Sequence, residues 1–237
     1  HLNTGNPIVY TSADSVLQIA AHEQVFGLDR LYKTCSIAAE IFYDLRVQRI
    51  IARPFLGENK EEFYRTKNRK DFLIPPPIDT LCDRVIKSGK KCFGVGKISD
   101  IFGHRGISES VSGMSDDKLF DEMLDIILKA NAGDLIFANF VEFDTLYGHR
   151  RDLSGYARAL ESFDKKLPKL FSILNKDDFL VITADHGNDP SFAGTDHTRE
   201  QVPVLIKNHN VINKCYGLIN FSDIGSLLET FLGLEKY

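Results

Sequence analysis

The sequence has no tryptophan, no closely spaced cysteine pair and no long apolar run. Cys35, Cys82, Cys92 and Cys215 stand far apart without a CxxC motif, which indicates reduced thiols in a cytoplasmic protein rather than a disulfide framework. No apolar run approaches the roughly 20 residues that span a bilayer, and the N-terminus lacks the basic-then-apolar order of a signal peptide. These absences predict a protein without a membrane partner.

The sequence also has no excess of basic charge: 33 Asp and Glu outnumber 29 Lys and Arg, and the net charge is −4. The basic residues are scattered along the chain, so a nucleic-acid partner is not expected. At 237 residues and 43% hydrophobic, the chain is long enough to bury a substantial core. Its only methionines are Met114 and Met123, and we therefore expect further sequence upstream of His1.

The first part of the chain predicts a mixture of helices and a strand. Ser12 has the side chain of a helix N-cap, and Val16, Ile19, Ala20 and Val25 follow at helical spacing. A second amphipathic helix is expected over 28–45. The short β-branched run at 49–52, bounded by Pro54, predicts a strand, and the polar stretch 57–70 predicts a hairpin or an exposed loop.

The proline run at 75–77 cannot continue a helix or pair inside a sheet, so we expect a domain boundary there, between 1–74 and 75–237. Beyond it, helices are predicted at 80–88, 116–130, 153–174 with a break at Pro168, and 222–232. Strands are predicted at 92–95, 134–140, 179–182 and 202–206. This alternation predicts an α/β fold with a mostly parallel sheet between helices, and with ligand sites at the carboxyl ends of its strands.

The segment 183–198 carries carboxylates and imidazoles directly after the apolar run 179–182. Asp185 and His186 are adjacent there, and His197 follows eleven residues later across a loop that contains glycine. Several such ligands delivered to one place indicate a metal site. The alternative is a loop that uses Asp, Asn, Gly and Thr only for its turns.

A second strand end supplies more ligands of the same types. The predicted strand 134–140 runs on to Asp144 and His149, so two strand ends would deliver Asp144, His149, Asp185, His186 and His197. Five candidates exceed one tetrahedral shell and suggest two ions, and without thiolates Mn²⁺, Mg²⁺ and Zn²⁺ all suit them. For His149, a local role beside Arg150 and Asp152 remains the alternative.

Long motifs extend this interpretation to most of the chain. The sequence is similar to phosphopentomutases of the alkaline phosphatase superfamily at IVYTSADSVLQIAAHE, GVGKISDIFGHRGI, DTLYGHRRDLSGY and TADHGNDPSFAGTDHTREQVP, the segments 8–23, 94–107, 144–156 and 183–203. The resemblance implies a cytoplasmic isomerase of nucleoside salvage that interconverts the 1-phosphate and 5-phosphate of ribose or deoxyribose. It also implies an alkaline-phosphatase-like core with two manganese ions and a smaller α+β cap domain.

The resemblance assigns roles to individual positions. Asp144, His149 and His197 resemble the ligands of one manganese, and Asp185 and His186 resemble part of the shell of the second. Ser12 and Asp14 resemble residues that hold the pentose hydroxyls, whereas Arg53 and Lys97 resemble residues that grip the non-reacting phosphate. The alternatives are a helix start for Ser12 and Asp14 and solvated surface charges for Arg53 and Lys97.

The chain departs from the family at its beginning. The early core strands, an aspartate ligand of the second metal and the phosphorylated threonine of the family have no counterpart here, so we expect the nucleophile upstream of His1. Thr11, Thr145, Thr183, Thr195 and Thr198 lie inside other motifs. We therefore expect residues 1–237 to be inactive alone; the alternatives are a metal-dependent phosphohydrolase of the same superfamily and a non-catalytic remnant that binds metal or sugar phosphate.

Overall fold

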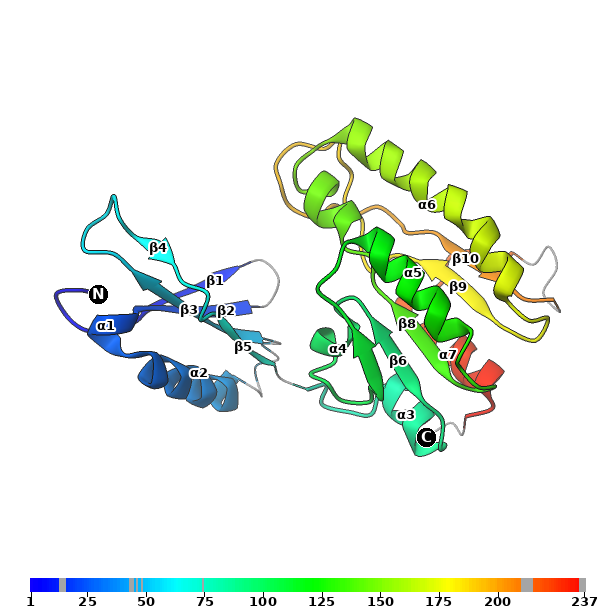
Figure 1. The fold of residues 1–237 in the computed structure, drawn as a ribbon, viewed down its shortest axis with the longest axis horizontal. Coiled ribbons are helices and arrows are strands. Elements are labelled where there is room, and N and C mark those ends of the chain that lie inside the picture. The colour runs from blue at the N-terminus through cyan, green and yellow to red at the C-terminus, as the bar shows by residue number, and fades with distance from the viewer. Residues whose placement is uncertain are drawn as a thin grey trace. The chain divides into compact units, whose positions relative to one another are not determined.

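The computed structural model describes residues 1–12, 16–42, 45, 47, 49–73, 75–209 and 215–234. The chain divides into two compact units, His1–Pro77 and Ile78–Tyr237 (Figure 1). The division falls at the end of the proline run, three residues beyond the boundary expected at residue 74. The assignment of the two parts as a cap and a metal-binding core stays a prediction.

The first unit is a five-stranded sheet with helices. Its elements are β1 (Ile8–Ser12), β2 (Val16–His22), α1 (Glu23–Phe26), α2 (Leu28–Phe42), β3 (Arg49–Leu56), β4 (Tyr64–Arg65) and β5 (Lys70–Leu73). The strand order is β1-β2-β3-β4, and β5 also pairs with β3. Among the described strands of this unit, β2 and β3 pair in parallel and the other pairs are antiparallel.

Helix α2 covers one face of this sheet. Its buried residues Leu31, Cys35 and Ala38 pack in one cluster with residues of β2 and β3, among them Ile19 and Ile50. The amphipathic pattern at 28–45 therefore predicted a real helix, which ends at Phe42. Burying this stripe against the sheet, rather than helix propensity alone, stabilises it.

The helix predicted from Ser12 onward is wrong, because Val16–His22 forms the strand β2. This strand lies between β1 and β3, and both of its faces are largely buried. A strand buried on both faces has a nearly continuous apolar run, and such a run also contains matches to helical spacing. Ala13 and Asp14 lie outside the described residues.

The strand predicted at 49–52 is confirmed, but it continues through Pro54 to Leu56. Strand β5 pairs with β3 only as far as Ala52, and β4 pairs with it only from Phe55. Pro54 therefore lies in the interval between these two partners on that side, where no backbone N–H is required. The polar stretch 57–70 contains the short strand β4.

The second unit alternates strands and helices. Its elements are α3 (Leu81–Lys87), β6 (Cys92–Val95), α4 (Ile98–Ile101), β7 (Glu109–Val111), α5 (Asp116–Ile127), β8 (Leu135–Ala138), η1 (Phe143–Gly148), α6 (Leu153–Ile173), β9 (Leu180–Thr183), β10 (Val204–Lys207) and α7 (Phe221–Leu232). Strand β6 lies between β7 and β8 and is parallel to both, whereas β9 and β10 form an antiparallel pair. The predicted α/β class is confirmed, with the parallel pattern confined to β6, β7 and β8 among the described strands of this unit.

The core of this unit forms where α5 and α6 meet the parallel sheet. Phe120 of α5 and Leu170 of α6 are almost fully buried and cluster with Val95 of β6. Helix α6 continues through Pro168, so the predicted break is wrong. Pro168 lies on the exposed side of the helix, where solvent can satisfy the carbonyl that loses its partner, and the opposite side stays packed through Leu170.

None of the helices in the described part of the chain has both the length and the apolar character of a membrane-spanning segment.

The buried Asp83 carboxylate ties the start of α3 to the segment that follows α4. It accepts hydrogen bonds from the backbone N–H of Thr80 at 2.7 Å, the Thr80 hydroxyl at 2.8 Å and Arg105 Nε at 3.0 Å. Burial raises the pKa of Asp83, but the bonds from Arg105 and Thr80 outweigh it and hold the pKa below its usual value. The ionised form is therefore favoured in the folded state.

We expect Asp83→Asn to lower the free energy of unfolding by about 2 kcal/mol at neutral pH, because hydrogen bonds to a charged group are lost in a buried place. A carboxyl whose folded-state pKa is lowered stabilises the protein above its unfolded-state pKa of about 3.9, and this contribution disappears as the pH falls through the folded-state value. Urea unfolding of both proteins at several pH values should show the difference narrowing in acid. Asp79→Asn, at an exposed carboxylate paired with Lys87, is the control and should cost less than about 1 kcal/mol; equal losses would contradict the argument.

Candidate metal centre

The ends of β8 and β9 carry the candidate ligands of the second unit. Asp144 lies in η1, which follows β8, whereas Asp185 and His186 follow β9 directly. His197 belongs to the segment between β9 and β10, and a bridge between Gly187 and Thr198 closes that segment on itself. The chain thus brings its candidates to strand ends, where α/β folds bind ligands.

The wide π-helical turn of η1 sets the relation between Asp144 and His149. The backbone N–H of His149 donates to the Asp144 carbonyl at 2.9 Å, which is a bond across five residues. In an α-helix, residues five apart point about 140° away from each other. Here His149 Nε2 lies 3.2 Å from Asp144 Oδ2, so the wider turn places the two side chains on one side.

The turn before η1 is held by a carboxylate from another helix. Asp116, in the first turn of α5, accepts hydrogen bonds from the N–H groups of Val141 at 3.1 Å and Glu142 at 2.8 Å. Burial is the main cause that raises the pKa of Asp116. Helix α5 therefore helps to set where η1 begins.

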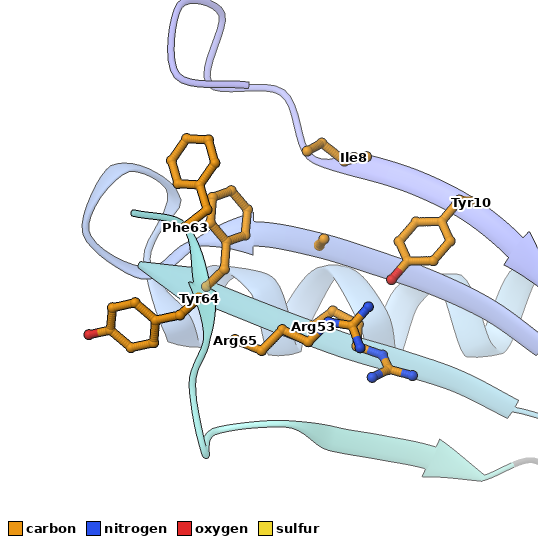
Figure 2. Close-up of a pocket in the computed structure, with 8 residues that line it drawn as sticks. Ile8, Tyr10, Arg53, Phe63, Tyr64 and Arg65 are labelled. Carbon is orange, nitrogen blue, oxygen red and sulfur yellow. The ribbon is translucent and has the colours of Figure 1, made fainter. Parts of the chain in front are cut away.

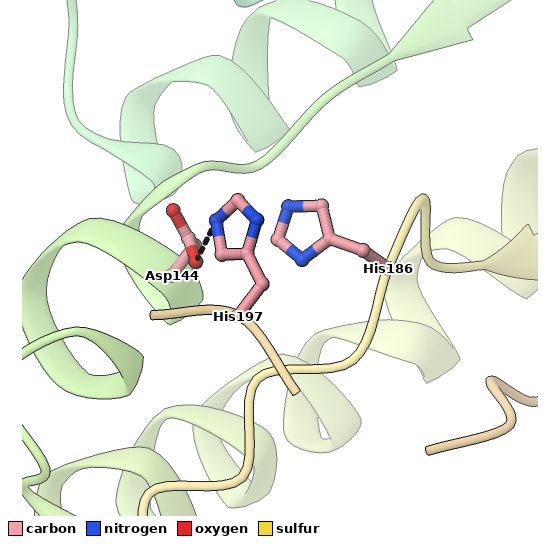
Figure 3. A group of neighbouring side chains, drawn as sticks. All are labelled: Asp144, His186 and His197. Carbon is pink, nitrogen blue, oxygen red and sulfur yellow. Dashed lines mark ion pairs between the residues drawn. The ribbon is translucent and has the colours of Figure 1, made fainter. Parts of the chain in front are cut away.

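Asp144, His186 and His197 form one group, in which one ligand atom of each lies within 4.8 Å of the others (Figure 3). His197 Nε2 lies 3.4 Å from Asp144 Oδ1, and the rings of His186 and His197 stack with centroids 3.7 Å apart. Figure 3 shows His197 between the other two side chains. One carboxylate and two imidazoles from separate segments thus converge.

Backbone carbonyls select the tautomers of His149 and His186. His149 Nδ1 lies 2.5 Å from the Thr195 carbonyl, and His186 Nδ1 lies 3.2 Å from the Gly187 carbonyl. A carbonyl only accepts, so in each neutral ring Nδ1 carries the proton and Nε2 keeps its lone pair. Metal-binding histidines are oriented in the same way, and this donor set therefore fits a divalent ion.

Asp185 differs from the other four predicted ligands. Its carboxylate Oδ1 lies 3.7 Å from His186 Nε2, and its side chain is 68% exposed. Like His149, it lies outside the group formed by Asp144, His186 and His197, but His149 lies 3.2 Å from Asp144. The structure thus brings His149, His186 and His197 to Asp144, and leaves the Asp185 side chain exposed to solvent beside His186.

Lys97 stands at the same edge of the parallel sheet. It follows β6, is exposed, and lies just before α4. Gly96 makes the tight turn possible: its φ is +77°, and a Cβ there would come 2.1 Å from the Asn139 carbonyl oxygen. Since β6 and β8 are parallel neighbours, Lys97 leaves the sheet at the same end as the segment that carries Asp144.

The remaining predicted site residues belong to the first unit. Arg53 lies on β3 and lines a pocket of about 380 Å³ (Figure 2). The other residues that line it are Ile8, Tyr10, Ala20, Phe55, Phe63, Tyr64 and Arg65. Arg53 Nε is buried without a hydrogen-bond partner in the described part of the chain, and burial, followed by the charges of Arg69 and Arg65, lowers the pKa of its guanidinium. Asp14 lies outside the described residues, as does the side chain of Ser12.

Asn188 is a site residue that the sequence did not single out. It is 8% exposed, and its Nδ2 donates to Asp144 Oδ1 at 2.5 Å. Gly148 leaves room for it, because a Cβ at Gly148 would lie 2.5 Å from Asn188 Nδ2. The one signal in the sequence was that Asn188 lies in the segment 183–189 beside predicted ligands. An asparagine after a glycine usually indicates only a turn.

We expect Gly148→Ala to lower the free energy of unfolding by about 1–3 kcal/mol, because the added methyl must displace Asn188 from its bond to Asp144. Gly225→Ala is the matched control: nothing lies within 4 Å of its Cβ position in α7. That change should stabilise the helix by about 0.5–1 kcal/mol. Urea unfolding of both variants measures this, and a Gly148→Ala protein as stable as the wild type would show that Asn188 is not held in place.

A solved structure shares the fold. The structure of the PH0037 protein from Pyrococcus horikoshii superposes with a TM-score of 0.55, is 13% identical, and is matched over 87% of this chain and 65% of its own length. At such low identity the likeness concerns the fold alone. It supports the α/β class assigned above.

Curated relatives bear out the resemblance read from the motifs. The phosphopentomutase of Chromohalobacter salexigens is 52% identical over 99% of this chain, and that of Legionella pneumophila is 49% identical over 100% of it. The chain spans 57% and 58% of their respective lengths. A family model described as the metalloenzyme superfamily matches residues 90–236, which include every candidate ligand at the ends of β8 and β9. The chain belongs to the metalloenzyme superfamily.

Proposed function

We propose that the protein containing this chain is a phosphopentomutase that interconverts the 1-phosphate and 5-phosphate of ribose or deoxyribose. The observation that carries the proposal is the convergence of Asp144, His186 and His197 within 4.8 Å. It occurs in a chain 52% identical to a relative named phosphopentomutase. The proposal includes a role in cytoplasmic nucleoside salvage.

The proposed centre holds two divalent ions, with Mn²⁺ favoured and Mg²⁺ or Zn²⁺ as alternatives. Asp144, His149 and His197 would bind one ion, and Asp185 and His186 would bind part of the other. When bound, the ions would neutralise charge on the transferred phosphoryl group and lower the pKa of the attacking hydroxyl. The short distances among Asp144, His186 and His197 support adjacent ions, since paired ions in such sites lie about 3.5–4 Å apart.

The substrate contacts are proposed from the motifs. Lys97 would bind the non-reacting phosphate as a point charge, and its place at the carboxyl end of β6 supports this. Arg53 would grip phosphate as a planar fork, supported by a buried Nε that has no acceptor in the described part of the chain. Ser12 and Asp14 would bind the pentose hydroxyls.

The proposed activity belongs to the whole protein, because this chain spans 57% of the Chromohalobacter relative. Two of its motif threonines already have partners at the site: the Thr145 hydroxyl donates to the Val141 carbonyl at 3.0 Å, and the Thr198 hydroxyl accepts from the Asp189 N–H at 2.6 Å. The proposal therefore assigns the phosphoryl-carrying role to neither of these two threonines.

Pentose-phosphate isomerisation measured with Mn²⁺ tests the proposal. The full gene product should interconvert the two phosphates, whereas residues 1–237 alone should not. Release of inorganic phosphate without isomerisation would favour the phosphohydrolase alternative. Turnover by residues 1–237 alone would place the nucleophile within them.

His197→Ala should weaken Mn²⁺ binding by more than about tenfold, because it removes an imidazole that lies 3.4 Å from Asp144. His209→Ala removes an exposed imidazole outside the group and serves as the matched control. Manganese content after gel filtration, followed by a titration, gives the comparison. Equal loss in both variants would remove His197 from the proposed ligands.

A further inference from the structure

Arg151 has an unusual backbone conformation immediately after η1. Its φ is +55°, in the left-handed region that residues other than glycine seldom adopt. Such a conformation persists where surrounding interactions hold it. Here the hydrogen bonds of the Arg151 side chain hold this backbone conformation.

The Arg151 guanidinium donates to acceptors from two segments, and none of them is a carboxylate. The acceptors are the carbonyls of Gly148 at 3.0 Å, Asp189 at 3.0 Å, Gly194 at 2.6 Å and Asp196 at 2.6 Å, and Asn188 Oδ1 at 2.6 Å. Because these acceptors are neutral, the planar guanidinium binds them through the directions of its N–H groups and not through an ion pair. Arg151 therefore binds the segment after β9 to the end of η1.

Asn188 transmits this contact to Asp144. Because Arg151 can only donate, the Asn188 oxygen faces the guanidinium and its Nδ2 must face the other way. That Nδ2 donates to Asp144 Oδ1, the same oxygen that lies 3.4 Å from His197 Nε2. The orientation of the Asn188 amide therefore holds Asp144 Oδ1, the carboxylate oxygen that faces His197.

The same guanidinium also fixes the backbone that carries His197. Its bonds to the Gly194 and Asp196 carbonyls lie on either side of Thr195, whose own carbonyl accepts from His149 Nδ1. Three consecutive peptide carbonyls before His197 are thereby occupied by side chains of the segment 149–151. This docking holds the backbone that leads into His197.

We infer that Arg151 and Asn188 are positioning residues of the metal centre, which hold the Asp144 carboxylate and the His197 backbone in the arrangement that binds the ion. The inference rests on the proposed function, since it requires that Asp144 and His197 bind metal. Neither residue would touch the ion. Outer partners of this kind commonly change metal affinity by about 10–100-fold when they are replaced.

Two variants test this in the full-length protein, with Mn²⁺ affinity measured by titration. Arg151→Gly removes the side chain and leaves a residue that adopts the left-handed conformation freely. Asn188→Leu keeps a similar shape but removes both hydrogen bonds. Arg150→Ala, at the exposed neighbouring arginine, is the matched control, and thermal unfolding without metal reports any loss of fold.

Both variants should raise the Mn²⁺ dissociation constant by about 10–100-fold, while Arg150→Ala leaves it unchanged. Added guanidinium ion should restore affinity to Arg151→Gly and not to Asn188→Leu. The double variant should bind Mn²⁺ no more weakly than the single variant with the lower affinity, because Asn188 acts on Asp144 in the orientation that Arg151 sets.

Wild-type affinity in both variants would overturn the inference while leaving the proposed metal centre intact. Additive losses in the double variant would overturn the shared route through Asp144. If the loss of Mn²⁺ affinity only followed the decrease in melting temperature of the metal-free protein, Arg151 and Asn188 would have a structural role alone. A wild-type protein that binds no Mn²⁺ would overturn the proposed centre and the inference together.

Discussion

The Asp144 carboxylate is the point on which the arrangement of the second unit's site depends. One of its oxygens faces His149 at 3.2 Å, and the other faces His197 at 3.4 Å and the Asn188 amide at 2.5 Å. These partners come from the turn after β8 and from the segment after β9. A single carboxylate therefore contacts side chains of two loops that are distant in the chain.

The elements around Asp144 explain why a short polar segment can hold this geometry. Helix α5 supplies Asp116 to the backbone before η1, and the π-helical turn brings His149 to the side of Asp144. Gly148 lacks the side chain that would collide with Asn188. Each device constrains backbone rather than burying apolar surface, because loops at a strand end have little core of their own to pack against.

The sequence alone predicted helix α2 from its amphipathic stripe. It predicted the strands β6 and β8 from apolar runs that are too short for a helix. Strand β2 was mistaken for a helix because burial on both faces removes the alternation that identifies a strand. The break expected in α6 was wrong because packing along the inner side of the helix outweighs one missing hydrogen bond at Pro168.

At the site, the sequence by itself determined the chemistry: which segments carry carboxylates and imidazoles, and that these segments follow strands. Ligand types and strand ends are local properties, so they can be read from neighbouring residues. Only the tertiary structure decided that Asn188 donates to Asp144, that Arg151 binds the segment after β9, and that the Asp185 side chain stays exposed to solvent. These contacts join residues up to 45 positions apart, and their existence depends on how the two loops pack, which no local pattern encodes.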